Sequence, residues 1–405
     1  MGPLKGIRVL DVGMYYQGPA AGYMLGDLGA DVIKIEPPVT GDRQRGVSSM
    51  YGALMTTPDG RSVAFEAGNR SKRSMTLDLQ NAAGKDVLHK LVSKSDVFIT
   101  NFSNRVIKEL NLEYETLSRY NPKLIYGATS AFGGKGPLAD RVGYDPVGQA
   151  FSGAMWMFGD RDDPEPSMVV GSIFDQLAAT LLVYGVLAAL VARNSQGVGQ
   201  KVETSLVGGG IHLQAYDINT FFFRGRGMQR FSRKRCRNPL TNYYKCADGK
   251  WIMLSEPRGG VHWQAFCKAI GIPGLENNEQ FNTFDARRKN YAEFIALLDQ
   301  TFATKTRDEW INIFSNYDFG YSPVYDRSDL TNEPQLLANE YVVEMQHPAW
   351  GKVKTVGFPV QFSRTPAAIR SAAPEFGQHT EEILSEVLGY SWDEIGSLRE
   401  KGAFG

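Results

Sequence analysis

Cysteine is scarce in this chain. The 405 residues include only Cys236, Cys246 and Cys267. They are widely spaced and form no CxxC pair, so the sequence indicates neither a disulfide framework nor a zinc site built from thiolates. No secretory leader is recognisable ahead of the first apolar segment. We therefore expect reduced thiols and a cytoplasmic protein.

An excess of charge of either sign is also lacking. Lys and Arg together number 44, as do Asp and Glu, so the formal net charge at pH 7 is zero. A balanced charge gives no general attraction to nucleic acid or to an anionic membrane, and we expect neither as a partner. The one strongly basic stretch, residues 224–237, has seven cationic side chains. We expect a solvated loop there, or a rim that attracts an anionic ligand.

The common cofactor signatures are missing as well. The chain contains no GxGxxG after its first strand, no GxxxxGK[ST], no HExxH and no GxSxG. Dinucleotide oxidoreduction, ATP hydrolysis, metal-dependent hydrolysis and the α/β-hydrolase mechanism are all disfavoured. We expect no metal, and surface or core positions for the five histidines.

One long apolar run stands out, at residues 170–193. Its uncharged part, Leu177 to Val191, is shorter than the roughly 20 residues that cross a membrane, so a helix buried inside the protein is expected. Asp175 lies near the start of this helix. Such a carboxylate can cap the helix or interact with its dipole, or it can be held ready as a nucleophile or base. Spacing alone leaves both roles open.

The first third of the chain alternates strand and helix patterns. Residues 6–13 and 30–36 have strand patterns and flank a helical pattern at 20–29, and the same rhythm continues to residue 131. This alternation predicts an α/β fold with a mostly parallel sheet covered by helices on both faces. The length predicts two domains, and the pattern changes after residue 206, where a smaller domain should begin. Thr380 is expected to cap a late amphipathic helix.

Seven segments, in order along the whole chain, resemble the class III CoA-transferases, the family of formyl-CoA, carnitine and bile-acid CoA-transferases. They are PLKGIRVLDVGMYYQGPAAGYMLGDLGADVIKIEPPVTGDRQRG, NRSKRSMTLDL, DVFITNF, YDPVGQAFSG, IFDQLAATLLVYGVLAAL, SQGVGQKVETSL and GQHTEEILSEVLGY. The resemblance implies a Rossmann-like large domain formed by both chain ends (1–205 and 336–405), a linker (206–238), and a smaller inserted α+β domain with a return linker (239–335). It also implies an interlocked homodimer.

The resemblance implies a role for Asp175. In the family, the aspartate ahead of the Ala-rich helix attacks an acyl-CoA, which gives a mixed anhydride that is then exchanged with a free carboxylic acid. By family position, Tyr16 and Gln17 face the reacting centre, where backbone N–H groups of the same turn would stabilise the oxyanion. Expected contacts of coenzyme A, the co-substrate as acyl-CoA, are Leu77, Gln80, Asn101, Phe102, Arg105, Lys108, Tyr144 and Asp145. Of these, Arg105 and Lys108 would meet phosphates or lie on a solvated helix face.

Two alternatives stay open. The related α-methylacyl-CoA racemases have a histidine where this chain has Tyr144, so two-base racemisation would lack one partner. A non-catalytic acyl-CoA-binding subunit is the other, and the intact Asp175 favours an active chain. The resemblance implies a bulky acid (carnitine-like, bile-acid, aromatic or 2-hydroxy). Formate or oxalate is not expected, because Pro37 stands where formyl-CoA transferase has an arginine that stacks on adenine and the glycine-rich lid of that enzyme is missing. Residues 154–158 would form an apolar wall of the pocket or part of the core.

Overall fold

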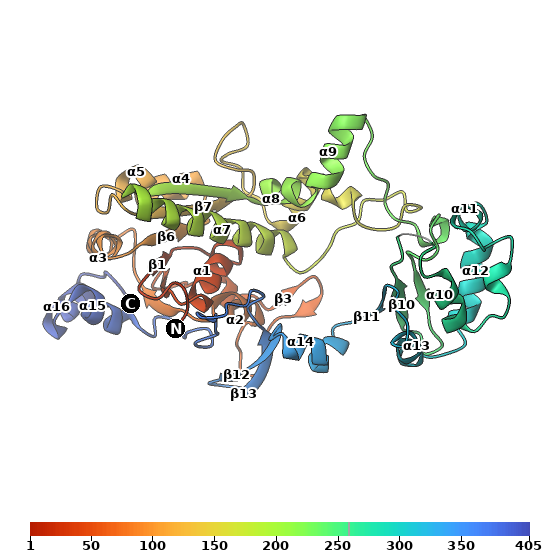
Figure 1. Cartoon of the computed structure of the whole chain (residues 1–405). Helices are drawn as coiled ribbons and strands as arrows, with labels where there is room; N and C mark the ends of the chain where they lie inside the picture. The colour runs from red at the N-terminus through yellow and green to blue at the C-terminus, as the bar shows by residue number, and fades with distance from the viewer. Residues whose placement is uncertain (258–259) are drawn as a thin grey trace. The chain divides into compact units, whose positions relative to one another are not determined.

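The computed structural model describes residues 1–257 and 260–405, which form two compact units (Figure 1). The first unit contains both chain ends and the second is inserted into it. Unit 1 comprises Met1–Met155, Met168–Met228 and Gln335–Gly405, and unit 2 comprises Trp156–Ser167 and Gln229–Pro334.

Unit 1 is built on a six-stranded sheet in the order β5-β2-β1-β6-β7-β8, in which every neighbouring pair is parallel. Its strands are β1 (Arg8–Asp11), β2 (Asp31–Glu36), β5 (Arg73–Thr76), β6 (Val97–Thr100), β7 (Ile125–Ser130) and β8 (Gln200–Ser205). All four residues of β6 are buried, as expected of a central strand covered on both faces. The predicted α/β class with a parallel central sheet is confirmed.

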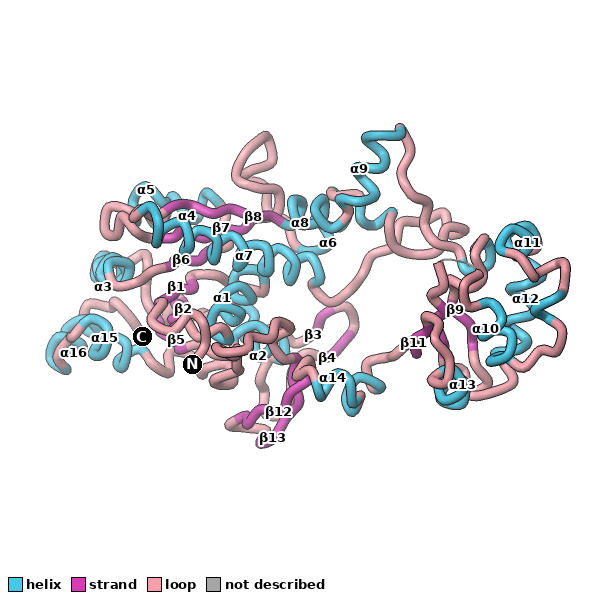
Figure 2. Tube along the Cα trace, in the orientation of Figure 1, coloured by secondary structure: helices cyan, strands magenta, loops and turns pink. Residues whose placement is uncertain are grey.

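Helices cover both faces of this sheet (Figure 2). Val9 and its neighbour Leu10 belong to separate core clusters because successive side chains of a strand point to opposite faces. Helices α1 and α7 pack on the Val9 side, whereas α3 and α15 pack on the Leu10 side. The helices of this unit are α1 (Gln17–Asp27), α2 (Val63–Asn69), α3 (Ala82–Ser93), α4 (Asn104–Leu110), α5 (Tyr114–Leu117), α6 (Asp145–Phe151), α7 (Ile173–Gln196), α8 (Leu206–Leu213), α9 (Ala215–Arg224), α15 (Thr380–Leu388) and α16 (Trp392–Glu400), with α14 (Pro334–Ala338) at the boundary between the units.

Helix α7 is the long apolar element that the sequence predicts. By length and composition alone it could cross a membrane, but it packs here against α1, β7, β8 and α8. Gly185 allows this packing, since a Cβ atom there would lie 2.6 Å from a methyl carbon of Val202 in β8. Gly197, in the left-handed conformation (φ 77°), ends the helix.

Two hairpins of unit 1 have no clear signal in the sequence. They are β3 (Ser49–Met50) with β4 (Ala53–Leu54), and β12 (Val342–His347) with β13 (Gly351–Val356). The expectation for Thr380 was wrong, because His379 is the residue that precedes α15. The Thr380 hydroxyl instead accepts a hydrogen bond from the Thr76 N–H (3.0 Å), which ties α15 to β5.

Unit 2 has a three-stranded antiparallel sheet, β9 (Tyr243–Lys245), β10 (Trp251–Leu254) and β11 (Tyr321–Val324). Its helices are α10 (Trp263–Ile270), α11 (Phe284–Lys289), α12 (Tyr291–Phe302) and α13 (Arg307–Phe314). The predicted Asp248-Gly249 turn joins β9 and β10. Part of the basic stretch forms ion pairs within unit 2. Arg233 forms a bidentate pair with Asp299 (2.8 and 2.9 Å), and Arg235 pairs with Asp162 (3.2 Å).

Candidate active site

A cavity of about 810 Å³ opens in unit 1 at the carboxyl ends of its parallel strands. Segments that follow β1, β2, β5, β6 and β7 line it, together with the first turn of α7. Open α/β sheets bind their ligands at this edge, and the volume lies in the range of small-molecule and cofactor sites. The cavity is therefore the candidate site of this unit.

Most residues predicted from the sequence line this cavity. They are Tyr16, Gln17, Leu77, Gln80, Asn101, Phe102, Tyr144 and Asp175. Arg105 and Lys108 are instead exposed on α4 and do not line it, and Arg105 pairs with Glu109 (3.0 Å). Residues 154–158, considered as an apolar wall, do not line it either.

The turn after β1 is held by side chains from other loops. The Asn101 side-chain amide pairs with the backbone of Met14, accepting from its N–H (2.8 Å) and donating to its carbonyl (2.7 Å). Tyr15 adopts a left-handed conformation (φ 61°), and its N–H donates to Asp42 (3.0 Å). Gly18 leaves room for the Asn101 side chain at the start of α1, because a Cβ atom there would lie only 3.1 Å from the Asn101 side-chain oxygen. Gln17, the first residue of α1, lines the cavity, so α1 begins there, and helix N-termini favour anions.

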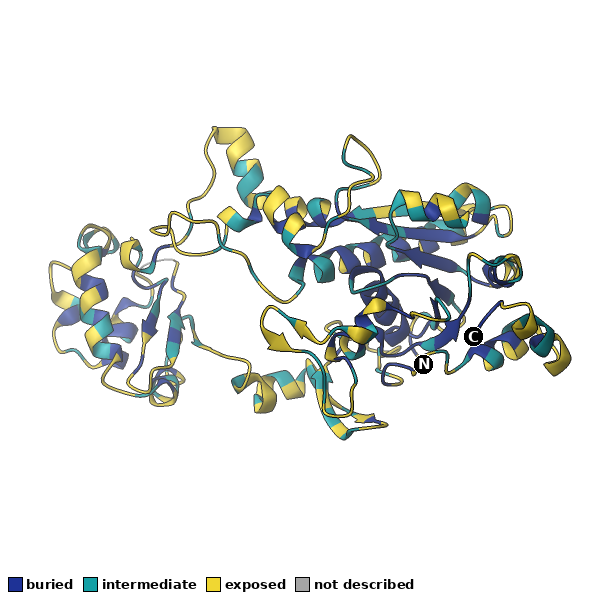
Figure 3. Cartoon of the chain, turned by 180° about the vertical axis from the view of Figure 1, so that it is seen from behind, coloured by how far each residue is buried: buried dark blue, intermediate teal, exposed yellow. Residues whose placement is uncertain are grey.

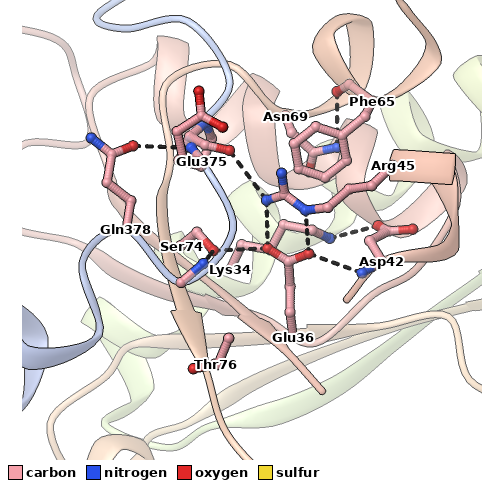
Figure 4. A network of polar contacts seen from close by, with 12 residues as sticks. Lys34, Glu36, Asp42, Arg45, Phe65, Asn69, Ser74, Thr76, Glu375 and Gln378 are labelled. Carbon is pink, nitrogen blue, oxygen red and sulfur yellow. Dashed lines mark hydrogen bonds and ion pairs between the residues drawn. The ribbon is translucent and has the colours of Figure 1, made fainter. Parts of the chain in front are cut away.

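Charged side chains of β2 and of the segment after it form a buried network (Figure 4), which is hydrogen-bonded to the turn after β1. Lys34 donates to the Gly13 carbonyl (3.1 Å) and pairs with Asp42 (2.8 Å), and both side chains are fully buried. Glu36 accepts from the Asp42 N–H and from Arg45. Burial alone would raise the pKa of Glu36, but Arg45 and Lys34 together hold it below its usual value. The network fixes the loops that follow β1 and β2, because an unpaired charge in this position would be costly.

Asp175 lies in the first turn of α7, where the capping role is filled by another residue. Ser172 precedes the helix in a left-handed conformation (φ 54°) and provides no side-chain cap. The carboxylate of Asp145 instead accepts from the N–H groups of Phe174 (2.6 Å) and Asp175 (3.1 Å). Asp145, predicted as a contact of coenzyme A, is itself buried and does not line the cavity. It receives a hydrogen bond from Gln149 (2.5 Å). Of the two roles open from the sequence, this geometry favours a reactive carboxylate at Asp175.

The surroundings of Asp175 raise the pKa of its carboxyl group. Burial raises the pKa of this carboxyl, the negative charge of Asp145 raises it further, and a hydrogen bond with Ser172 lowers it, with a net pKa of about 7. An acid that titrates near neutral pH beside a second carboxylate, in a cavity, is typical of a functional site.

The predicted acyl-positioning residues, Tyr16 and Gln17, line the same cavity as Asp175. The hydroxyl of Tyr16 donates to the side-chain oxygen of Gln176 (3.0 Å), the residue that follows Asp175. Gln176 in turn donates to the hydroxyl of Tyr23 (3.1 Å). The side-chain amide of Gln17 lies 3.5 Å from the Ser130 carbonyl. Tyr16 is thus fixed as a wall of the cavity by its own hydroxyl group.

Sequence reasoning missed two cationic residues that line the cavity, Arg43 and Arg141. Both are exposed, and neither forms an ion pair within the described residues. Arg43 begins a 3-10 turn (Arg43–Gly46) directly after the buried Asp42, whereas Arg141 lies in a loop before α6. Arg43 lies in the first of the seven segments that resemble the family, so the sequence offered a signal for it. Arg141 lies in no recognisable motif.

Comparison with known proteins identifies the family of the chain. The model of the family described as CoA-transferase family III matches residues 4–380. Succinyl-CoA–D-citramalate CoA-transferase of Chloroflexus aurantiacus is 30% identical over 399 residues, covering 98% of this chain and 97% of that protein. (R)-2-hydroxy-4-methylpentanoate CoA-transferase of Clostridioides difficile is 28% identical over 400 residues, covering 98% of each chain.

Among solved structures, a CAIB/BAIF family protein from Brucella suis superposes with a TM-score of 0.85 at 28% sequence identity, covering 95% of this chain and 99% of that one. The family model and the relatives each match nearly the whole chain. The chain belongs to CoA-transferase family III and is an enzyme that acts on acyl-CoA.

Proposed function

We propose that this enzyme transfers CoA from an acyl-CoA donor to a free carboxylic acid through a mixed anhydride on Asp175. The observation that carries the proposal is the pair of carboxylates at the start of α7. Asp145 caps the helix and leaves the neighbouring carboxylate of Asp175 at the cavity, without a backbone hydrogen bond among the described residues. An ionised carboxylate in that position is a suitable nucleophile.

The proposed reaction proceeds in three steps. An oxygen of Asp175 attacks the thioester carbonyl, the C–S bond breaks, and CoA departs as its thiolate. The acceptor carboxylate attacks the Asp175 carbonyl of the anhydride, releases the donor acid and forms a second anhydride. The thiolate attacks the acceptor carbonyl, which gives the new thioester and restores the Asp175 carboxylate.

Each addition step places negative charge on a carbonyl oxygen. We propose that the free N–H groups at the start of α1, beside Tyr16 and Gln17, stabilise that oxyanion, a contribution of about 10² to 10³ in rate for one donor. The segments that contain Leu77, Gln80, Asn101 and Phe102 would bind CoA. Arg43 and Arg141 are better placed than Arg105 and Lys108 to meet its phosphates, since they line the cavity.

A bulky organic acid remains the proposed acceptor. The tyrosines at positions 15, 16 and 144 line the cavity, and Tyr15 packs edge-on against Tyr144 with ring centroids 5.9 Å apart. Relatives act on D-citramalate and on a 2-hydroxy acid, according to their names. Aromatic walls favour an acid with an apolar or branched body over formate.

We also propose that the chain works as a homodimer. Helix α9 has no buried residue, and its phenylalanines at 221, 222 and 223 are 52%, 71% and 83% exposed (Figure 3). Several exposed aromatic side chains on one helix are typical of an interface. Light scattering of the purified chain should give twice its mass of 44.9 kDa, and a stable monomer would contradict this proposal.

The anhydride proposal is tested by the first half-reaction alone. Isotopically labelled CoA should exchange into the acyl-CoA donor without any acceptor acid, because formation of the anhydride is reversible. Asp175→Asn should abolish this exchange, while Glu115→Gln, which changes an exposed acid on α5, should retain it. Exchange at the normal rate in Asp175→Asn would contradict the proposal.

A further inference from the structure

We propose that Tyr15, paired with Tyr144, selects the acyl group that is held on Asp175, and that it favours an acyl group with an aromatic or branched body. This assignment rests on the function proposed above and names a residue that determines its substrate specificity.

On one side, Tyr15 is tied to the first turn of α7 through its neighbour in the chain. The hydroxyl of Tyr16 donates to the side chain of Gln176 (3.0 Å), which directly follows Asp175. Tyr15, Tyr16 and Asp175 all line the same cavity. The turn after β1 is therefore joined to the helix at the position next to the reactive carboxylate.

On the other side, Tyr144 is tied to the same turn of α7. It precedes Asp145, whose carboxylate accepts from the N–H of Asp175 (3.1 Å). The rings of Tyr144 and Tyr15 meet edge-on, with their centroids 5.9 Å apart. A closed chain of contacts thus runs through Asp175 and back to the two rings, and both rings line the cavity together with Asp175.

The backbone at position 15 does not explain a tyrosine. Its φ angle of 61° lies in the left-handed region, which glycine adopts readily and a bulky aromatic residue rarely does. The conformation is imposed by the surroundings, since Asp42 accepts from the Tyr15 N–H (3.0 Å) and is itself held by Lys34 (Figure 4). Strain of this kind is often retained at functional sites.

Packing in the core does not explain the tyrosine either. Tyr15 is half-buried and belongs to none of the hydrophobic clusters of the described residues. Its aromatic neighbour, Tyr144, is 58% exposed. The Tyr15 hydroxyl makes no hydrogen bond to another described residue. The ring therefore contributes a surface of the cavity rather than a polar contact.

This surface lies where a covalently held acyl group would extend. In the proposed mechanism, donor and acceptor acyl groups are attached in turn to the same carboxylate of Asp175, so one wall acts on both. An acyl group with an aromatic or branched body removes apolar surface of the tyrosine pair from water, whereas a short acyl chain leaves that surface wet. The wall thus stabilises the anhydrides of bulky acids selectively.

The test compares two acyl-CoA donors that differ only in a phenyl group, 3-phenylpropanoyl-CoA and propanoyl-CoA. In the exchange of labelled CoA, the unmodified enzyme should have a kcat/KM at least about tenfold higher for the phenyl-bearing donor. Tyr15→Gly should reduce this ratio to less than about threefold, because the ring is lost while glycine suits the left-handed backbone. The loss should fall on the phenyl-bearing donor.

Two further variants separate the ring from other effects. Tyr15→Phe keeps the ring and should retain the ratio of the parent. Tyr184→Ala removes a 73% exposed ring from the same helix as Asp175, and it is the matched control because Tyr184 does not line the cavity.

A ratio near one in the unmodified enzyme, or an unchanged ratio in Tyr15→Gly, would overturn the assignment. An equal loss of the ratio in Tyr15→Phe would also overturn it, because the hydroxyl would then determine the selectivity. Failure of the proposed function would look different, since the unmodified enzyme would then exchange CoA into no acyl-CoA donor.

Discussion

Removing the negative charge of Asp145 should shift the pH dependence of anhydride formation. The reactive group is the ionised Asp175, whose pKa is raised to about 7, first by burial and second by Asp145. Its nucleophilic form is therefore lost as the pH falls through 7. Asp145→Asn removes the second cause and leaves the first, so we expect the pKa of Asp175 to fall by about one unit, which is equivalent to about 1.4 kcal/mol.

The magnitude is visible at pH 6. With a pKa of about 7, about a tenth of Asp175 is ionised at pH 6, whereas a pKa of about 6 leaves about half ionised. The exchange rate at pH 6, divided by the high-pH plateau of the same protein, should thus be about fivefold higher in Asp145→Asn. The rate is divided by the plateau because the substitution should also disturb the site. Asparagine has one side-chain oxygen, so it cannot accept hydrogen bonds both from the N–H groups of α7 and from the Gln149 side chain, and Gln149 cannot turn because it is hydrogen-bonded to the backbone of Val169. That mismatch should also cost about 1–3 kcal/mol of stability.

The assay is labelled-CoA exchange between pH 5 and 9, with Glu115→Gln as a control that should keep the parent profile. A midpoint in Asp145→Asn equal to or above that of the parent would refute the view that these carboxylates repel each other across the site.

Other consequences concern stability. Asp175→Asn should raise the free energy of unfolding above pH 7 by at least about 1 kcal/mol, with an upper limit of about 4 kcal/mol from the pKa difference. The folded-state pKa is the raised one, so the gain should shrink as the pH falls from 7 towards 4; urea denaturation at pH 8 and pH 5 tests this, and an equal gain at both would contradict it. Lys34→Met should cost about 3–5 kcal/mol, because it leaves Asp42 buried without its cation; Arg105→Met, at an exposed pair, should cost less than about 0.5 kcal/mol, and similar losses in both would refute the assigned role. Gly185→Ala should lower stability by about 1–3 kcal/mol by forcing α7 away from Val202, and an unchanged thermal midpoint would show that this contact is looser than the structure indicates.

The sequence predicts well the elements whose hydrophobic pattern extends over many residues and the turns that have characteristic turn residues. The first strand and helix of the sheet, the long helix that begins near Asp175, and the Asp248-Gly249 turn follow from patterns or turn residues that act locally. The cavity position also follows, because parallel strands bring their carboxyl ends to one edge.

The details of the site depend on contacts between distant residues. Asp145 caps a helix that begins 28 residues later, which no local cap rule detects. The β3–β4 hairpin has two-residue strands, too short for any periodicity, and its turn carries Tyr51 where the rules favour asparagine. Thr380 has the residue type of a cap but is bonded to the neighbouring strand. In each case a tertiary contact overrides the local preference.

The central claim is that one oxygen of Asp175 becomes acylated during turnover. Incubating the enzyme with an acyl-CoA donor and hydroxylamine, followed by proteolysis and mass spectrometry, tests it directly. The account predicts a hydroxamate on the peptide that contains Asp175, formed only when the donor is present. An unmodified Asp175 under conditions of full donor turnover would contradict it.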